Sequence, residues 1–197
     1  MSNYQFITFS GGGAKGAVYI GVYKALKQTK FFDNIQAASG SSAGAITAAL
    51  TSTGMSSERL KKVNENINFE KLLGDKTNWY GIERDGKPLH QFLIKNFKVS
   101  IEDCLHHLFL KREKKLSDKY FINAYEQICK ILSCDSEVSI SNEEKENKVF
   151  QEIQTILDKN GDITFQDLAI LNVLDPNNFK NLHITGVEKK NWKFSNF

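Results

Sequence analysis

Two glycine-rich segments near the start of the chain contain the residue types that could do chemistry. They are Gly11-Gly12-Gly13-Ala14-Lys15-Gly16 and Gly40-Ser41-Ser42-Ala43-Gly44. Consecutive glycines before a helix leave backbone N–H groups free to point at an anion, at the positive end of the helix dipole. A serine with glycines two positions before and two positions after it matches G-x-S-x-G, in which a nucleophilic hydroxyl lies on a sharp turn between a strand and a helix. The two segments therefore predict an anion hole and a nucleophile.

The first segment also fits G-x-G-x-x-G, but the residues around it argue against nucleotide binding. A dinucleotide site requires an acidic residue at the end of the second strand, where this chain has Ala38-Ser39-Gly40. A Walker A loop requires Lys and then Ser or Thr after the last glycine, where this chain has Ala17 and Val18. We therefore expect no nucleotide, and the sequence indicates no other cofactor.

Strands and helices alternate around these segments. Tyr4–Phe9 and Ile35–Ser39 are short apolar runs that end at the glycine-rich segments, and they predict strands. Gly16–Thr29 and Ala45–Leu50 predict helices. Because the first half of Gly16–Thr29 is apolar all round, we expect that half to be buried. Strand–helix–strand–helix order predicts an α/β fold, with a parallel-sheet core that is covered by helices on both faces.

Both segments are expected at the same edge of this sheet, because the carboxyl ends of parallel strands lie together. Backbone donors beside a serine nucleophile form the arrangement that stabilises the oxyanion of acyl transfer. The alternative for the second segment is structural, since Ser41 or Ser42 could simply cap the helix that follows.

The two motifs and the spacing between them resemble those of the patatin-like phospholipases, in particular bacterial members. Weaker similarity comes from Gly81–Gly86 and from Ile163–Leu168. The resemblance implies hydrolysis of lipid acyl esters, a phospholipase A type of reaction, by a Ser-Asp dyad. The implied site residues are the nucleophile Ser42, the oxyanion-hole residues Gly11, Gly12, Gly13 and Ala43, the elbow glycines Gly40 and Gly44, and Lys15 and Gly16 of the first motif.

The base that this dyad needs is missing from the chain. The family's aspartate lies in an Asp-Gly-Gly or Asp-Gly-Ala motif, and neither tripeptide occurs here; Asp85-Gly86 is followed by Lys87. We therefore expect one patatin-like domain at 1–197, incomplete at its C-terminus, with the aspartate beyond it. Low activity of this chain alone follows, because a serine hydroxyl without a base is a poor nucleophile. His183 is the alternative base, although its alternation with apolar neighbours favours a surface-facing strand residue.

Further elements are expected downstream. Helices are predicted after Ser56-Ser57-Glu58, after Pro88, at Tyr120–Leu132 and at the end of Ile163–Leu168, with an exposed polar loop at 135–148 and two strands at Leu182–Val187 and Trp192–Phe194. The region 111–160 is rich in Lys, Arg, Asp and Glu, and it predicts a charged insertion of helices or loops.

The composition excludes several classes of protein. A chain of 197 residues, 41% of them apolar, suits one globular domain. The net charge of +3 is too small to indicate nucleic acid. The chain shows neither a secretory signal nor an apolar run of the ~18 residues that a membrane span needs. Cys104, Cys129 and Cys134 fit reduced thiols better than a zinc site with His106 and His107, so no metal is expected.

These features support one leading function and two alternatives. The leading one is a lipid acyl hydrolase that acts on a lipid or phospholipid at a membrane surface. We expect it in the cytoplasm or at the membrane periphery, with export without a cleaved signal also open and any activating protein partner unidentified. Lys15 could attract a lipid phosphate or could be an ordinary solvated lysine. The alternatives are a catalytically inactive, truncated relative that serves as a binding module, and a thioesterase or peptidase with His183 as base.

Overall fold

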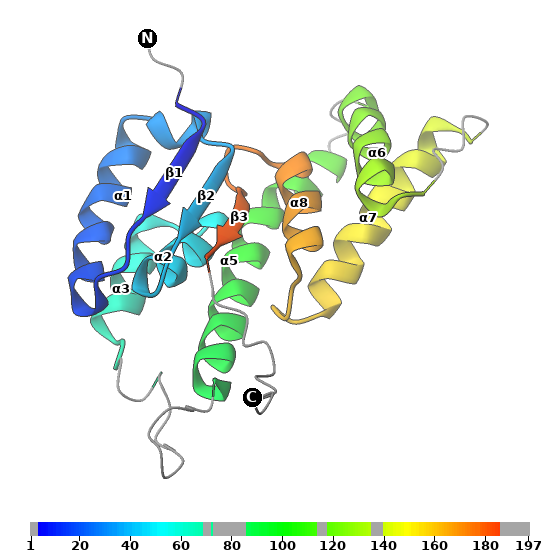
Figure 1. The fold of residues 1–197 in the computed structure, drawn as a ribbon. Coiled ribbons are helices and arrows are strands. Elements are labelled where there is room, and N and C mark those ends of the chain that lie inside the picture. Colours follow the sequence, from blue (N-terminus) through cyan, green and yellow to red (C-terminus); the bar gives the residue numbers. More distant parts are fainter. Residues whose placement is uncertain (1–3, 69–71, 73–85, 114–117, 135–139, 186–197) are drawn as a thin grey trace, which may run out of the picture.

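The computed structural model describes residues 4–68, 72, 86–113, 118–134 and 140–185 of the 197-residue chain. Figure 1 shows a small sheet beside a group of helices. In chain order the elements are β1 (Phe6–Phe9), the 3₁₀ helix η1 (Gly13–Ala17), α1 (Val18–Gln28), the 3₁₀ helix η2 (Phe31–Asn34), β2 (Ala37–Gly40), α2 (Ala43–Ser52), α3 (Ser57–Glu65), α5 (Lys87–Glu113), α6 (Asp118–Leu132), α7 (Asn142–Asp158), α8 (Phe165–Leu174) and β3 (Asn181–Ile184).

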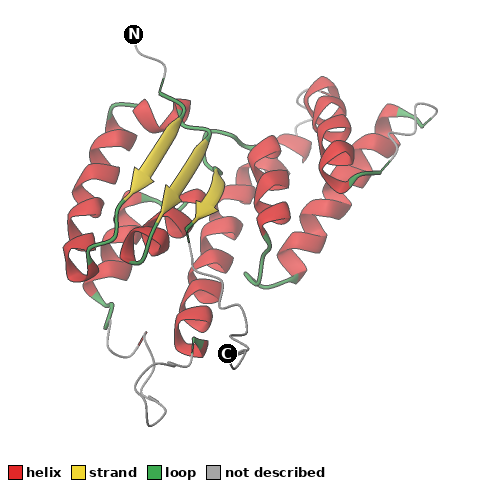
Figure 2. Cartoon of the chain, viewed as in Figure 1, coloured by secondary structure: helices red, strands yellow, loops and turns green. Residues whose placement is uncertain are grey.

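The described strands form a parallel sheet in the order β1-β2-β3 (Figure 2). In its register Phe9 lies opposite Gly40, and Gly40 lies opposite Ile184. Helix α2 packs against one face, where Phe9 and Ala38 form an apolar cluster with the helix. On the other face the side chains of Thr8 and His183 are exposed. The predicted α/β class with a parallel sheet is confirmed, and α2 is the helix that contacts all three described strands.

The start of α1 differs from the prediction. Val18 and Val22 are 67% and 44% exposed, so the expected burial of the first half of this helix is wrong. Tyr23 is fully buried, and its ring packs edge-on against Phe32 at 4.9 Å between centroids. The reason is geometric: a helix packed on one side buries only the residues that recur every three or four positions, whatever the composition of its other face.

The charged region 111–160 contributes a core as well as a surface. Helices α6 and α7 pack against each other and, with α5 and α8, they form the largest apolar cluster of the described residues. The predicted loop at 135–148 is wrong from residue 142 onward, because α7 begins at Asn142. Ser141 and Glu144 form a capping box at this start, in which each side chain bonds the other residue's backbone N–H.

Other predicted elements are found close to their expected positions. Ser56 caps α3 by accepting a hydrogen bond from the N–H of Arg59, and Pro88 lies in the first turn of α5. The predicted strand at Leu182–Val187 corresponds to β3, whereas Trp192–Phe194 and most of the Gly81–Gly86 motif lie outside the described residues. Among the described helices, none combines the length and apolar character needed to cross a membrane.

The N-terminus of α8 is fixed by a buried carboxylate. Asp167 accepts hydrogen bonds from the N–H and hydroxyl of Thr164, and both of its oxygens lie 2.7 Å from the Lys159 ammonium. Burial by itself raises the pKa of Asp167, but the hydrogen bonds from Lys159 and Thr164 outweigh it and hold the pKa below its ordinary value. This carboxylate therefore favours the folded state while it is ionised.

We predict that Asp167→Asn lowers the free energy of unfolding by about 1–3 kcal/mol at pH 7, because a charged hydrogen-bond acceptor is lost from a buried site. The folded pKa lies below the unfolded one, so the stabilisation is present above the unfolded pKa and is lost as the pH falls through the folded one. The difference in melting temperature from wild type should therefore shrink below about pH 4. Glu144→Gln, in the exposed capping box of α7, is the matched control and should cost less. A constant difference across this pH range would contradict the assignment.

Candidate active site

Ser42 lies on a sharp turn between β2 and α2. Its backbone has φ 51° and ψ −127°, a left-handed conformation that side chains with a Cβ rarely adopt. Ser42 is the N-cap residue of α2, yet its side chain makes no capping hydrogen bond and is exposed. The capping alternative therefore gains no support from the geometry. Strained backbone of this kind persists only where the surrounding structure enforces it.

The flanking glycines enforce this turn through close approach of the backbone. A Cβ at Gly44 would meet the carbonyl oxygen of Phe9, and it would lie 2.5 Å from that of Ser10. A Cβ at Gly40 would meet the carbonyl group of Gly44 and would lie 2.7 Å from the nitrogen of Ala45. Both positions therefore exclude any side chain, which is the physical reason for glycine two residues before and two residues after the serine.

The two glycine-rich segments contact each other, as the sequence predicts. The N–H of Gly11 donates a hydrogen bond of 3.1 Å to Ser41 Oγ. A Cβ at Gly11 would lie 3.4 Å from that of Ser42, and one at Gly16 would lie 3.4 Å from that of Ala43. The start of α2 thus lies directly against the first segment.

Gly13 and Ala43 line the same cavity as Ser42, and Gly12 precedes them in the first glycine-rich segment. Within the described residues, the amides of Gly12, Gly13 and Ala43 have no recorded hydrogen-bond acceptor, whereas the Gly11 amide is occupied by Ser41. Gly13 has φ +56°, and nothing lies within 4 Å of the position that its Cβ would take. The side chain of Lys15 lies outside the described part of the structure.

Tyr19 of α1 forms hydrogen bonds to Ser10, the residue before the first glycine-rich segment. Its hydroxyl donates to the Ser10 carbonyl oxygen at 2.7 Å and lies 2.8 Å from Ser10 Oγ. Its ring packs edge-on against Phe9, with 5.2 Å between centroids. Sequence reasoning did not assign this role, because the only local signal was an aromatic residue one turn into a helix.

An apolar cavity of about 470 Å³ opens at Ser42. It is lined by the elbow and α2, by Leu89 and Leu93 of α5, and by Ile184 and Thr185 at the end of β3. The described residues that line it include no carboxylate and no imidazole. His183 is exposed on the other face of the sheet and does not line it. The sequence predicts the helix after Pro88, but it does not predict that this helix lies beside Ser42.

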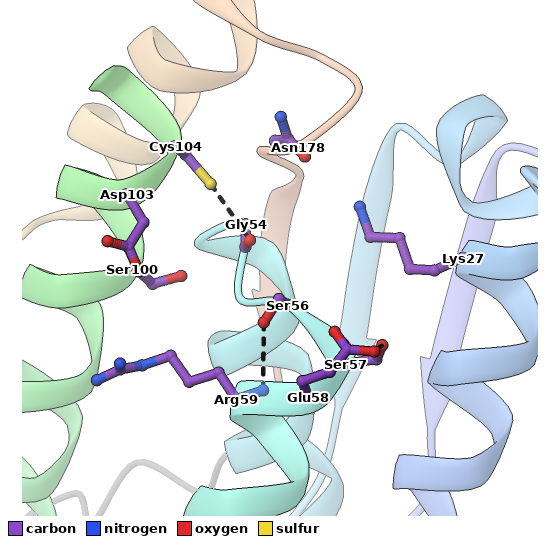
Figure 3. Close-up of a pocket in the computed structure, with 10 residues that line it drawn as sticks. All are labelled: Lys27, Gly54, Ser56, Ser57, Glu58, Arg59, Ser100, Asp103, Cys104 and Asn178. Atoms are coloured by element: carbon purple, nitrogen blue, oxygen red, sulfur yellow. Dashed lines mark hydrogen bonds between the residues drawn. The ribbon is translucent and has the colours of Figure 1, made fainter. Parts of the chain in front are cut away.

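A second pocket, of about 390 Å³, lies near the amino ends of the strands (Figure 3). Lys27, Ser56, Asp103 and Cys104 are among its polar lining residues. The Cys104 thiol donates to the Gly54 carbonyl oxygen at 3.3 Å, and burial raises its pKa to about 11. This thiol is therefore protonated at neutral pH and is a poor nucleophile. The candidate nucleophile remains Ser42, at the other end of the sheet.

Comparisons with known proteins agree with this geometry. Residues 7–170 match the family model described as patatin-like phospholipase. The uncharacterized protein YqhO of Bacillus subtilis (strain 168) is 40% identical over 65 residues, which make up 33% of this chain and 22% of YqhO.

Solved structures of two bacterial proteins are similar in fold. The type III effector protein ExoU is 23% identical, with a TM-score of 0.59 over 94% of this chain and 33% of ExoU. In the structure of the heterodimeric ExoU-SpcU complex from Pseudomonas aeruginosa, the matched chain is 26% identical. The TM-score is 0.57 over 93% of this chain and 30% of the matched chain. VipD from Legionella pneumophila is 23% identical, with a TM-score of 0.57 over 93% of this chain and 37% of VipD. The chain thus spans about a third of the length of the solved chains that it matches.

We predict that Gly44→Ala destabilises the fold by about 3 kcal/mol or more, because the added methyl group meets backbone carbonyls that cannot move aside. The matched control is Gly21→Ala on the exposed side of α1, where nothing lies within 4 Å and alanine should stabilise the helix by about 0.5–1 kcal/mol. Chemical denaturation measures both. Equal effects of the two substitutions would show that Gly44 is not held by close approach.

Proposed function

Because the chain belongs to the patatin-like phospholipase family, we propose that it is a lipid acyl hydrolase with Ser42 as its nucleophile. The observation that carries the proposal is the strained backbone of Ser42, at the mouth of an apolar cavity and beside unoccupied amides. The Ser42 hydroxyl neither caps α2 nor packs in the core, so the turn leaves it free to react with a ligand in the cavity.

The arrangement supports a two-step acyl transfer. Ser42 Oγ attacks the ester carbonyl, and the N–H groups of Gly12, Gly13 and Ala43 donate to the oxyanion that forms. The alcohol part leaves, and water then releases the fatty acid from the acyl-serine. The apolar lining of Leu89, Leu93 and Ile184 suits the acyl chain. Gly11 contributes by holding Ser41, and hence the turn, in place.

We infer that the base comes from outside residues 1–197. The described lining of the cavity holds no group able to take the Ser42 proton, and the sequence contains neither Asp-Gly-Gly nor Asp-Gly-Ala. The chain covers only about a third of the solved chains it matches, which is consistent with this inference. Without a base, an oxyanion hole alone retains a small part of the rate enhancement.

The lack of a base among the described lining residues also favours a second candidate function. In this alternative the chain is a binding module that has kept the cavity and lost catalytic activity. A thioesterase or peptidase with His183 as base gains no support, since His183 does not line the cavity. For either remaining candidate we propose a lipid or phospholipid ligand at a membrane surface. ExoU is described as a type III effector that forms a complex with SpcU, and by analogy we propose export and a protein partner for this chain too.

We predict that a fluorophosphonate probe forms its adduct on Ser42 and on neither Ser39 nor Ser41, as located by peptide mapping. The left-handed turn exposes only Ser42 beside the unoccupied amides, whereas Ser41 Oγ accepts from Gly11 and Ser39 Oγ bonds Thr8. Labelling and p-nitrophenyl ester hydrolysis by residues 1–197 should both be slow and should both disappear in Ser42→Ala. Ser39→Ala is the matched control. Fast turnover would place a base inside this chain, and the absence of any adduct would favour the binding module.

We predict that Gly13→Ala slows the labelling of Ser42 by 10²–10³-fold, equivalent to roughly 3–4 kcal/mol of barrier. The methyl group has open space around it, but alanine disfavours φ +56° and should turn the N–H away from the oxyanion site. Stability should fall by only about 1–2 kcal/mol, as measured by thermal unfolding. Gly21→Ala controls for the substitution type. An unchanged labelling rate would remove Gly13 from the oxyanion hole.

A further inference from the structure

The cavity beside Ser42 continues into a second apolar compartment. This compartment has a volume of about 380 Å³, and it shares Ala49, Leu93 and Ile184 with the first. We propose that the two form one channel, in which a long acyl chain passes Leu93 and ends against α8, so that the second compartment sets the preferred chain length. The identity of the occupant rests on the proposed function.

One face of α2 lines the whole channel. Ser42, Ala45, Ile46, Ala49 and Thr53 line one or both compartments, and they recur at the spacing of three or four residues that places side chains on one side of a helix. From Ser42 to Thr53 this face is about 16 Å long. The nucleophile therefore stands at one end of a straight apolar path, which suits an extended chain with its reacting carbonyl at that end.

The junction between the compartments is formed by residues of unequal size. Ala49 of α2, Leu93 of α5 and Ile184 of β3 line both compartments, and Ala49 is the smallest of the three. Ile184 is 48% exposed although it is apolar. An apolar ligand in the channel would cover surface that otherwise faces water.

The far side of the second compartment is lined by residues of α5 and α8. Phe97 lies on α5, and Phe165 and Leu168 lie on the first turn of α8. That turn is fixed by the Asp167–Lys159 pair and by the capping hydrogen bonds of Thr164. Phe165 is 60% exposed, so this side of the compartment is an apolar surface against which the end of a bound chain would pack.

The lining defines the chemistry of the occupant. Neither compartment has a charged side chain among its described lining residues, and the polar side chains there are the hydroxyls of Ser42, Thr53, Thr164 and Thr185. A phosphate or carboxylate would lose its hydration in such a channel without a charged partner. The head group of the lipid therefore stays at the Ser42 end, and only the hydrocarbon enters.

Binding of free fatty acids to the purified chain tests the channel without requiring turnover. Butyrate, octanoate, dodecanoate and palmitate are titrated below their micelle concentrations by calorimetry. Affinity should rise about fourfold for each added methylene, equivalent to about 0.8 kcal/mol, until the channel is full. Affinity that is independent of chain length, or no binding of any acid, overturns the proposal.

Two substitutions locate the second compartment. Ala49→Leu narrows the junction, so the rise in affinity should stop at a shorter chain, with dodecanoate and palmitate weakened at least tenfold and butyrate unchanged. Phe165→Ala removes an aromatic wall from the second compartment alone, and it should weaken palmitate several-fold. Its matched control is Phe6→Ala, because Phe6 is 67% exposed on β1 and lines neither compartment.

The outcomes of this experiment are separable from those of the catalytic one. If Ala49→Leu does not fold, the palmitate affinity of Phe165→Ala, compared with that of Phe6→Ala, still tests whether the second compartment binds the chain. Equal loss of palmitate affinity in both phenylalanine variants, or a length limit unchanged by Ala49→Leu, overturns the channel. Length-dependent binding without any Ser42 labelling supports the channel and contradicts only the hydrolase assignment.

Discussion

The close approach of α2 to the end of β1 is the constraint on which the rest of the site depends. Gly44 lies against the carbonyl groups of Phe9 and Ser10, so the helix can start only where no side chain intervenes. This contact forces the chain to turn sharply at Ser42 and brings Ser42 beside the first glycine-rich segment. A parallel sheet makes the contact possible, because it places the carboxyl ends of β1 and β2 at the same edge.

Helix α2 connects this turn to the rest of the molecule. One of its sides packs on the sheet through Ala48, while the side that carries Ala45 and Ala49 faces the apolar channel toward α5. Small residues serve both purposes, since they allow close packing on one side and leave space on the other. The proposed nucleophile and the surface proposed to receive an acyl chain are therefore parts of one rigid element.

Helices α5 and α8 line the second compartment, and α6 and α7 share a core with them. Their shared core includes Phe121, Phe150 and Leu171, and α8 packs against α6 and β3. A charged segment of sequence thus contributes to the site indirectly, by fixing where the second compartment ends. The composition of this segment does not reveal that role. In an amphipathic helix, the polar residues of the outer face outnumber the apolar residues that face the core.

The sequence by itself determined the local features of the site. The parallel α/β order, the elbow at Ser42 and the need for glycine at Gly40 and Gly44 follow from residue types within a few positions of one another, since turns and caps are local interactions. Only the tertiary structure decided which faces are buried. It exposed Val18, occupied the Gly11 amide and brought Leu93 and Ile184 to the serine. Those outcomes depend on partners far away in the chain, and no local pattern encodes the identity of a distant neighbour.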